Sequence, residues 1–247
     1  MPFVSTLRKM RSGKIPSCTV VIAAGGCSER MNGEDKLFVE IQGAPVLAHT
    51  LAAFSDCSYI KEIIVVARDT CMERVARICE QFEISKVSKV IVGGPTRLES
   101  VMNGVFAVSK KAEIIAIHDG ARPCVSPDII IKAIETAAKH HAAAPAVPIS
   151  STIKRVQGDI VKETVERDNL FEIQTPQVFA ASLIKAALTN ANRKSVDITD
   201  DCSAVELIGA SVHITEGSRC NIKITTQEDL FIAEAIIADA MRRKERQ

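Results

Sequence analysis

The residues best suited to chemistry lie in one short segment near the start of the chain. In VVIAAGGCSERM, residues 20–31, an apolar run passes into small residues and two glycines. Small residues let the backbone approach a ligand closely, and the N–H groups exposed in such a turn attract anions. The basic residues Arg30 and Lys36 follow the turn. Two cations after a glycine turn suit a polyphosphate, and the alternative is a plain tight turn with charges on its surface.

Two standard phosphate-binding motifs are absent from this turn. A Walker A motif needs Gly-Lys-Ser or Gly-Lys-Thr, and the turn contains neither. The dinucleotide motif G-x-G-x-x-G also fails, because Cys27 occupies the position of the second glycine and no further glycine completes it. What remains is a glycine turn whose affinity for phosphate would depend on its backbone and on the two cations.

A second glycine segment carries a basic residue and a hydroxyl. In GGPTRLES, residues 93–100, two glycines open the backbone directly after an apolar run. Ser100 lies three residues after Arg97, which places both side chains on the same face of the helix that follows. The segment therefore resembles the first one in position and in chemistry.

A third segment, IHDGARP at residues 117–123, contains an acid and a base close together. Asp119 could bind a metal ion that accompanies phosphates, and Arg122 could bind a phosphate. The alternative is that Asp119 caps a turn and pairs with Arg122. His118 directly follows apolar residues and is interpreted as a packed structural histidine rather than a catalytic base.

Alternating strands and helices must position these segments. Short apolar runs that suit strands covered on both faces occur at 19–24, 62–67, 89–94, 113–119 and 142–149. Segments with the apolar spacing of helices occur at 45–54, 70–82, 97–111 and 126–141, the last with Ser126 as N-cap and Pro127 at the first helical position. The pattern predicts an α/β fold with a mostly parallel sheet flanked by helices. Ligands of such sheets bind at the carboxyl ends of the strands, where the three charged segments lie.

The pattern changes after residue 150. Two short β-like stretches flank QGD, residues 157–159, and predict a hairpin within an arm at about 150–173. Because a two-stranded ribbon is marginally stable in water, we expect it to pack on a second subunit, and the alternative is a loose surface hairpin. Helical stretches at 182–193 and 200–208 follow, then strand-like SVHIT and NIKIT, and a terminal helix.

Composition narrows the class of protein. The net charge is +1, with no Trp and one Tyr, which argues against nucleic acid or a membrane as partner. The eight cysteines form no C-x-x-C pair, and no run reaches transmembrane length, so we expect a cytoplasmic protein with reduced thiols. Residues 1–17 are basic and predict a flexible leader, and residues 18–247 predict a single domain.

Seven motifs in order carry a resemblance that extends over residues 18 to 240. They are AAGG…ERM…DKLF, GG…R…S, HDGARP, STIKR, ETVER, QTPQVF and NIKITT. In this order they resemble the 2-C-methyl-D-erythritol 4-phosphate cytidylyltransferase family. The resemblance implies a nucleotidyltransferase fold with a Rossmann-like, mostly parallel sheet and a protruding β-arm. It also implies a homodimer joined through that arm, CTP and 2-C-methyl-D-erythritol 4-phosphate as substrates, and Mg²⁺ or another divalent cation as cofactor.

The resemblance also implies a role for each matching residue. The implied catalytic residues are Arg30, Lys36, Arg167 and Lys223. The implied CTP-binding residues are Ala23, Ala24, Gly25, Gly94, Ser100 and Gly120. The implied residues for the sugar phosphate are Arg122, Thr152 and Thr175, with Arg167 and Lys223 beside them and some supplied across the dimer, and Asp119 is implied to lie near the metal.

This sequence departs from the family pattern at two places. The glycine loop has one extra residue before Arg30, with Cys27 or Ser28 replacing the second glycine, and Pro95 stands where an acid is frequent. Two other functions stay open at this point. A ribitol-5-phosphate cytidylyltransferase would share the fold and the chemistry, and a catalytically dead nucleotide-binding or scaffold protein would share the fold alone.

Overall fold

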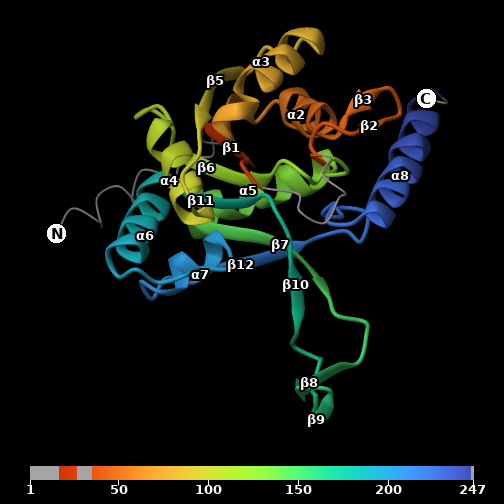
Figure 1. Cartoon of the computed structure of the whole chain (residues 1–247). Coiled ribbons are helices and arrows are strands. Elements are labelled where there is room, and N and C mark those ends of the chain that lie inside the picture. Colours follow the sequence, from red (N-terminus) through yellow and green to blue (C-terminus); the bar gives the residue numbers. More distant parts are fainter. Residues whose placement is uncertain (1–16, 27–34, 246–247) are drawn as a thin grey trace.

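The computed structural model describes residues 17–26 and 35–245. The predicted leader, apart from Ser17, and the basic residue Arg30 lie outside the described residues. An eight-stranded sheet forms the centre of the molecule (Figure 1). Its strands are β1 (Cys18–Ala24), β4 (Ile60–Ala67), β5 (Val87–Val92), β6 (Ile114–Asp119), β7 (Ala142–Pro148), β10 (Phe171–Ile173), β11 (Gln177–Ala180) and β12 (His213–Glu216).

The order of strands in this sheet is β10-β7-β11-β6-β1-β4-β5, and β12 also pairs with β7. The neighbours of β1 are parallel to it, as are β4 to β5 and β7 to β12. β11 is antiparallel to both β6 and β7, and β10 is antiparallel to β7. The predicted α/β class is therefore confirmed, with a sheet that is mixed rather than uniformly parallel.

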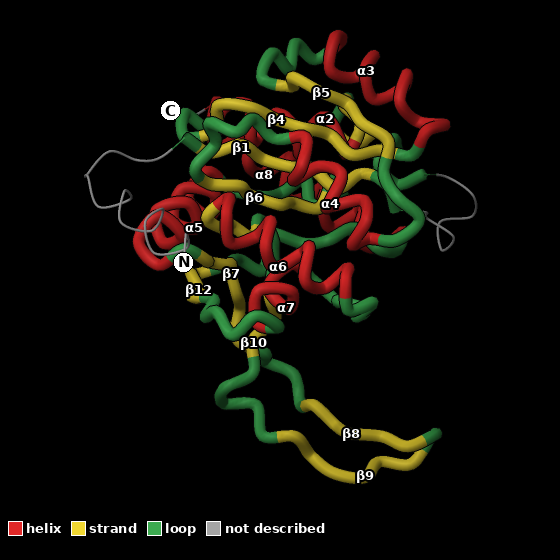
Figure 2. Tube along the Cα trace, turned by 90° about the vertical axis from the view of Figure 1, so that its left-hand side faces the viewer, coloured by secondary structure: helices red, strands yellow, loops and turns green. Residues whose placement is uncertain are grey.

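Helices cover both faces of the sheet (Figure 2). The helices are α2 (Val46–Asp56), α3 (Met72–Gln81), α4 (Arg97–Ala107), α5 (Pro127–His140), α6 (Ala181–Arg193), α7 (Asp201–Glu206) and α8 (Gln227–Glu245), and a 3-10 turn, η2 (Asp69–Cys71), precedes α3. Helices α4, α6 and α7 pack on one face, and α2, α3, α5 and α8 contribute to the core on the other. Within the described residues, no helix combines the length and the apolar character needed to cross a bilayer.

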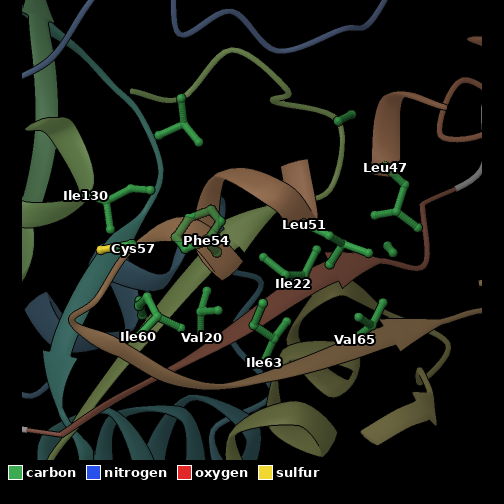
Figure 3. Packing of buried hydrophobic residues seen from close by; sticks show 14 of the residues in the cluster. Val20, Ile22, Leu47, Leu51, Phe54, Cys57, Ile60, Ile63, Val65 and Ile130 are labelled. Carbon is green, nitrogen blue, oxygen red and sulfur yellow. The ribbon is translucent and has the colours of Figure 1, made fainter. Parts of the chain in front are cut away.

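Strand β1 is covered on both faces of the sheet, which explains why its sequence is an almost continuous apolar run. Its successive side chains point to opposite faces, so Val20 and Ile22 pack beneath α2 whereas Val21 packs beneath α4. All three side chains are fully buried. Figure 3 shows Val20 and Ile22 among the buried residues of α2 and β4.

Helix α4, which follows the second glycine segment, is fixed at its start and in its middle. Thr96 and Glu99 form a reciprocal capping box that satisfies backbone N–H groups of the first turn. A Cβ atom on Gly104 would lie 2.4 Å from Cγ1 of Val21, so only glycine permits this close approach to the sheet. At the start of α5, the Ser126 hydroxyl accepts a hydrogen bond from the Ile129 N–H, as its predicted role as N-cap requires.

Two assignments from the sequence need correction. β11 enters the sheet between β6 and β7 and is antiparallel to both, although no strand was expected at 177–180. The strand has only four residues, which is too short to stand out as an apolar run in the sequence. NIKIT, residues 221–225, is not a strand. This segment crosses the end of the sheet as a loop, in which the Asn221 side chain donates to the Thr175 carbonyl and the Ile224 N–H donates to the Ala121 carbonyl.

Two short strand pairs lie outside the central sheet. β2 (Glu40–Ile41) pairs with β3 (Ala44–Pro45), and β8 (Ile153–Gln157) pairs with β9 (Ile160–Val165), with QGD at the turn between β8 and β9. The β8–β9 ribbon projects away from the sheet and its helices (Figures 1 and 2). Its apolar side chains of Val156, Ile160 and Val161 are more than half exposed.

Candidate active site

A cleft of about 390 Å³ lies at the carboxyl edge of the parallel strands. The loops that follow β1, β5 and β6 form most of it, together with residues near 36 and 223. Its lining residues are Ala23, Gly25, Gly26, Lys36, Leu37, Gly94, Pro95, Thr96, Arg97, Ser100, Asp119, Ala121 and Lys223. The three segments singled out in the sequence therefore meet in one place, as the rule for ligands of open α/β sheets predicts.

Small residues form the floor of the cleft where β1 ends. Ala23 is paired in register with Asp119 of β6, and its carbonyl accepts a hydrogen bond of 2.9 Å from the Gly120 N–H. Ala23 and Gly25 line the cleft, whereas Ala24 and Gly120 do not. Ala24 is buried in the core, and Gly120 packs behind the wall against Ala23 and Leu37. These two predicted CTP-binding residues therefore support the wall of the cleft.

The second glycine loop is held in one conformation by Ser100. The Gly94 N–H donates to the Ser100 hydroxyl at 3.0 Å, and that hydroxyl lies 3.1 Å from the Gly94 carbonyl oxygen, to which it can donate. A Cβ on Gly94 would lie 2.4 Å from the Cβ of Glu99, so a side chain cannot be accommodated here. Ser100 thus fixes the loop on which Gly94 and Pro95 face the cleft.

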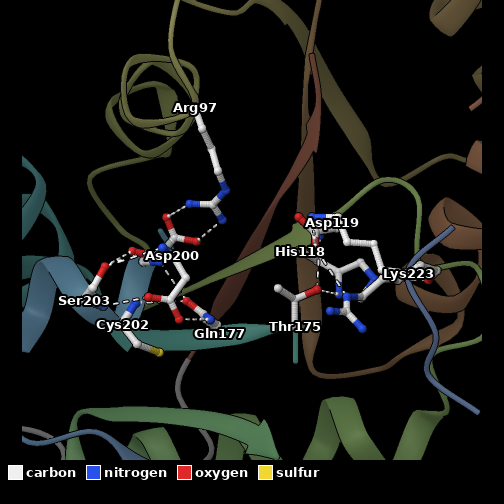
Figure 4. A network of polar contacts seen from close by, with 11 residues as sticks. Arg97, His118, Asp119, Thr175, Gln177, Asp200, Cys202, Ser203 and Lys223 are labelled. Carbon is white, nitrogen blue, oxygen red and sulfur yellow. Dashed lines mark hydrogen bonds and ion pairs between the residues drawn. The ribbon is translucent and has the colours of Figure 1, made fainter. Parts of the chain in front are cut away.

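Asp119 is the centre of a cluster of charges (Figure 4). Its Oδ2 atom lies 3.1 Å from Nζ of Lys223 and 3.3 Å from Nε of Arg122. Burial acts to raise the pKa of Asp119, but Lys223, Arg122 and Arg97 outweigh it and lower this pKa to about 2. The Asp119 backbone N–H donates to the Thr175 hydroxyl at 3.2 Å. Asp119 is therefore a permanent anion at neutral pH.

His118 supports this cluster from beneath. Its side chain is fully buried, with its ring 4.7 Å from that of Phe54. Nδ1 lies 2.9 Å from the Thr175 hydroxyl, and Nε2 lies 3.2 Å from the Arg122 carbonyl oxygen. Because that carbonyl can only accept, Nε2 carries the proton. Burial lowers the pKa of His118 to about 4, so the ring is neutral at pH 7 and the predicted structural histidine is confirmed.

The structure places Arg122 and Thr175 behind the cleft wall. Arg122 is almost fully buried, and its Nη1 donates to the Asn221 carbonyl oxygen at 2.7 Å. The Thr175 hydroxyl lies between His118 and the Asp119 backbone. Both side chains therefore hold Asp119 and the loop that carries Lys223, rather than facing the open cleft.

The remaining predicted residues divide into two groups. Lys36 lines the cleft, whereas Arg30 lies outside the described residues. Thr152 and Arg167 are exposed at the base of the ribbon, where the Arg167 guanidinium donates to the Ser150 carbonyl. Neither contributes to the cleft of its own chain, which is lined by other residues.

An ion pair in the cleft wall was not anticipated. Arg97, the first residue of α4, lines the cleft and binds the carboxylate of Asp201 with two hydrogen bonds, of 3.0 and 2.7 Å. In the sequence, Arg97 stood out because it lies three residues before Ser100 and so on the same face of the helix. No sequence signal pointed to Asp201, because its partner is 104 residues away.

Of the described residues that line the cleft, Asp119 is the one carboxylate available to a metal ion. Among the described residues, no group of three or more His, Cys, Asp or Glu side chains is arranged to hold a metal. Mg²⁺ is commonly held by one or two carboxylates together with substrate phosphates, so a single carboxylate is a sufficient protein contribution. The Oδ2 atom of this carboxylate is within ion-pair distance of both Arg122 and Lys223. The site thus fits Mg²⁺ that is shared with a phosphate.

Comparisons with known proteins agree with this arrangement. The family model for 2-C-methyl-D-erythritol 4-phosphate cytidylyltransferase matches residues 18–239. A relative of that name from Halalkalibacterium halodurans is 45% identical over 226 residues, which are 91% of this chain and 99% of the relative. A second, from Caldanaerobacter subterraneus subsp. tengcongensis, is 44% identical over 89% of this chain and 98% of its own length. The crystal structure of 4-diphosphocytidyl-2C-methyl-D-erythritol synthase from Anaerococcus prevotii aligns with a TM-score of 0.80 at 31% identity, over 90% of this chain and 96% of that one.

Proposed function

This chain belongs to the 2-C-methyl-D-erythritol 4-phosphate cytidylyltransferase family, and from that premise we propose how its cleft performs the reaction. The phosphate of 2-C-methyl-D-erythritol 4-phosphate attacks the α-phosphorus of CTP. The new P–O bond gives 4-diphosphocytidyl-2-C-methyl-D-erythritol, and the bond to the β-phosphate breaks to release pyrophosphate. The observation that carries the proposal is the convergence of Lys36, Lys223 and Asp119 on one cleft with two glycine loops.

The reaction needs positioning and charge more than it needs a base. The nucleophile is a phosphate oxygen that is already anionic at neutral pH, so no proton has to be removed from it. His118 is buried and neutral, which fits a reaction without a histidine base. The obstacle is the repulsion between this anion and the triphosphate, and fixed cations reduce it while they stabilise charge on the five-coordinate phosphorus.

We assign Lys36 and Lys223 by their position in the cleft and Arg30 by the family resemblance. Lys36 and Arg30 contact the CTP phosphates, and Lys223 orients the attacking phosphate beside Asp119. Lys36 and Lys223 both face the cleft, which supports their part of the assignment. Arg122 and Thr175 are proposed to act on the sugar phosphate through the placement of Asp119 and Lys223.

Asp119 is the residue we propose to hold Mg²⁺ or another divalent cation. Its low pKa keeps the carboxylate ionised, as coordination of a hard cation requires. The cation would neutralise part of the triphosphate charge when bound. The ion pair from Lys223 keeps the same carboxylate in place at the edge of β6.

Cytosine recognition is proposed to rest on the backbone around Ala23 and Gly94. The carbonyl of Gly94 lies near the Ser100 hydroxyl, and that of Ala23 accepts from the Gly120 N–H. Each carbonyl oxygen can accept a second hydrogen bond, which the cytosine amino group can donate. Uracil presents an oxygen at that place and would leave the carbonyl unpaired. Pro95 offers no carboxylate for this purpose, so the backbone has to supply the contact.

We propose that the β8–β9 ribbon joins two copies of the chain and brings Thr152 and Arg167 to the partner's cleft. The exposed side chains of Val156 and Val161 support this, because a water-exposed two-stranded ribbon with apolar side chains is marginally stable. Sedimentation of Val161→Glu against wild type tests it. A shift from dimer to monomer is expected, and an unchanged mass contradicts the proposal.

Pyrophosphate release tests the function directly. With CTP and Mg²⁺, we expect rapid release with 2-C-methyl-D-erythritol 4-phosphate, the acceptor in the name of the family, and little release with ribitol 5-phosphate. Binding of CTP without release for either acceptor would instead indicate a catalytically dead protein. We place the reaction in the cytoplasm, where the seven described cysteines, all unpaired, would remain reduced.

A further inference from the structure

The guanidinium of Arg97 has no part in the reaction as proposed so far. It begins α4 and lines the cleft together with Lys36 and Lys223, and about a third of its side chain is exposed. We infer that Arg97 is a further catalytic residue that binds a phosphate group of the substrates, and that Asp201 is the positioning residue that holds it. This inference rests on the proposed function, because the phosphate belongs to CTP or to the sugar phosphate.

The geometry of the pair leaves part of the guanidinium available. Nη1 donates to one carboxylate oxygen of Asp201 and Nη2 donates to the other, which fixes the plane of the Arg97 guanidinium. A guanidinium has five N–H groups, so three remain, and Arg97 has no other hydrogen-bond partner among the described residues. A planar fork with free donors matches two oxygens of one phosphate.

Asp201 is itself held rigidly. Its side chain is fully buried, and its backbone N–H donates to Oε1 of Gln177 at 2.9 Å, as does that of Cys202. Nε2 of Gln177 donates to the Asp200 carboxylate at 2.8 Å, so Gln177 anchors the start of α7 to strand β11 (Figure 4). A buried network attached to the sheet can hold the Arg97 fork in one orientation before a substrate arrives.

A purely structural role explains this arrangement less well. A buried ion pair is often no more stabilising than apolar residues of similar size, because both charges lose their water. This pair nevertheless lies in the wall of the cleft, where Arg97 retains exposed donors. Arg97 and its partner Asp201 form one charged group of the cleft wall, and Asp119 with Lys223 forms a second; Figure 4 shows Arg97 apart from Asp119 and Lys223. Two such groups can hold two different phosphates.

The experiment compares Arg97→Lys, Arg97→Gln and Asp201→Asn with wild type, and uses Arg77→Lys on α3 as the matched control. Pyrophosphate release gives kcat and the KM of each substrate, calorimetry gives the Kd of each, and thermal unfolding reports the fold. Arg97→Lys keeps the charge but loses the fork, and we expect kcat/KM to fall about 10- to 100-fold. If only the KM and Kd of CTP rise, Arg97 binds the triphosphate. If only the KM and Kd of the sugar phosphate rise, Arg97 binds the acceptor.

Asp201→Asn should raise the KM of the same substrate by a smaller factor, and Arg77→Lys should stay within about twofold of wild type. Folded Arg97→Lys and Arg97→Gln proteins with constants close to wild type would overturn the role of Arg97. If Asp201→Asn lowers the melting temperature and leaves the KM of both substrates unchanged, the proposal that Asp201 positions Arg97 is wrong. If wild type binds both substrates without turnover, the proposed function fails, and the Kd values of the Arg97 variants still decide this inference.

Discussion

Asp119 and Asp201 are two buried carboxylates near the same cleft, and their surroundings differ. The Asp119 side chain is 12% exposed and lies among Lys223, Arg122 and Arg97, which hold its pKa at about 2. The Asp201 side chain is fully buried and contacts one cation, Arg97; burial raises the pKa of its carboxyl and Arg97 opposes that rise. Nearby cations outweigh burial at Asp119, whereas at Asp201 the negative charges of Asp119 and Asp200 add to the effect of burial.

This difference separates two uses of a carboxylate. Asp119 lines the cleft, so its carboxylate can meet a metal ion that a phosphate brings with it, and the cations around Asp119 attract that phosphate. Both oxygens of Asp201 are committed to one guanidinium. We expect Asp119 to matter most for turnover and Asp201 most for stability and for the placement of Arg97.

The largest effect should follow from Asp201→Ala. Removal of the buried partner leaves the Arg97 guanidinium partly buried without its counter-charge, and we expect a loss of about 3 kcal/mol in the free energy of unfolding. Urea unfolding measures this loss. Glu163→Ala, which breaks the exposed pair with Arg155 on the ribbon, is the control and should cost less than about 1 kcal/mol. Equal losses of unfolding free energy in the two variants would contradict the expected difference between the buried and the exposed ion pair.

Asp119→Asn should reduce kcat on the order of 100-fold, because the amide lacks the negative charge that is proposed to hold a divalent cation and that pairs with Lys223. Pyrophosphate release measures kcat, and circular dichroism checks that the variant is folded. Asp201→Asn serves as the comparison and should lose less activity. If Asp201→Asn is the slower of the two, the division of roles is wrong.

The two carboxylates should respond to acid with opposite signs. The pKa of Asp119 is about 2 in the folded protein and 3.8 in the reference state, so its contribution is complete above about pH 5 and is lost as the pH falls toward 2. That contribution is on the order of 2 kcal/mol. The raised pKa of Asp201 has the opposite effect, since stability linked to it is present at low pH and lost as the pH rises.

Urea unfolding between pH 4 and pH 2.5 tests these signs. His118, with a folded pKa of about 4, also titrates at the upper end of this range, but its ring is present in all three proteins. We expect Asp119→Asn to lose less stability across the range than wild type, and Asp201→Asn to lose more. Parallel curves for all three proteins would show that neither carboxyl titrates as described.

The smallest effect is expected for Lys223→Ala. Lys223 is about 42% exposed and contacts Asp119 from the solvent side, so its loss should leave the fold intact. The KM for the sugar phosphate should rise about 10-fold, and more than the KM for CTP. Arg167→Ala should show the same selectivity if the ribbon reaches a partner's cleft. A rise in the KM of CTP alone would contradict the assignment of either residue.

The sequence determined where the parallel strands run and which residues follow them. Mostly apolar runs identified β1, β4, β6 and β7, because strands that are covered on both faces have few polar positions, and they also identified β5, a partly exposed strand at the end of the sheet. The carboxyl ends of parallel strands meet at one edge, so the pattern of strands alone predicted that Gly25, Gly94 and Asp119 lie together. Lys36 was found because a cation close after a glycine turn suits phosphate.

The tertiary structure decided which side chains face the cleft and which lie behind it. Arg122 and Thr175 have the residue types of ligand-binding groups, yet their polar atoms are used by Asn221, His118 and Asp119. Arg97 became part of the site only through Asp201, which packs against it from a distant part of the chain. Sequence patterns report burial and local geometry, whereas hydrogen bonds between distant segments depend on how the folded layers meet.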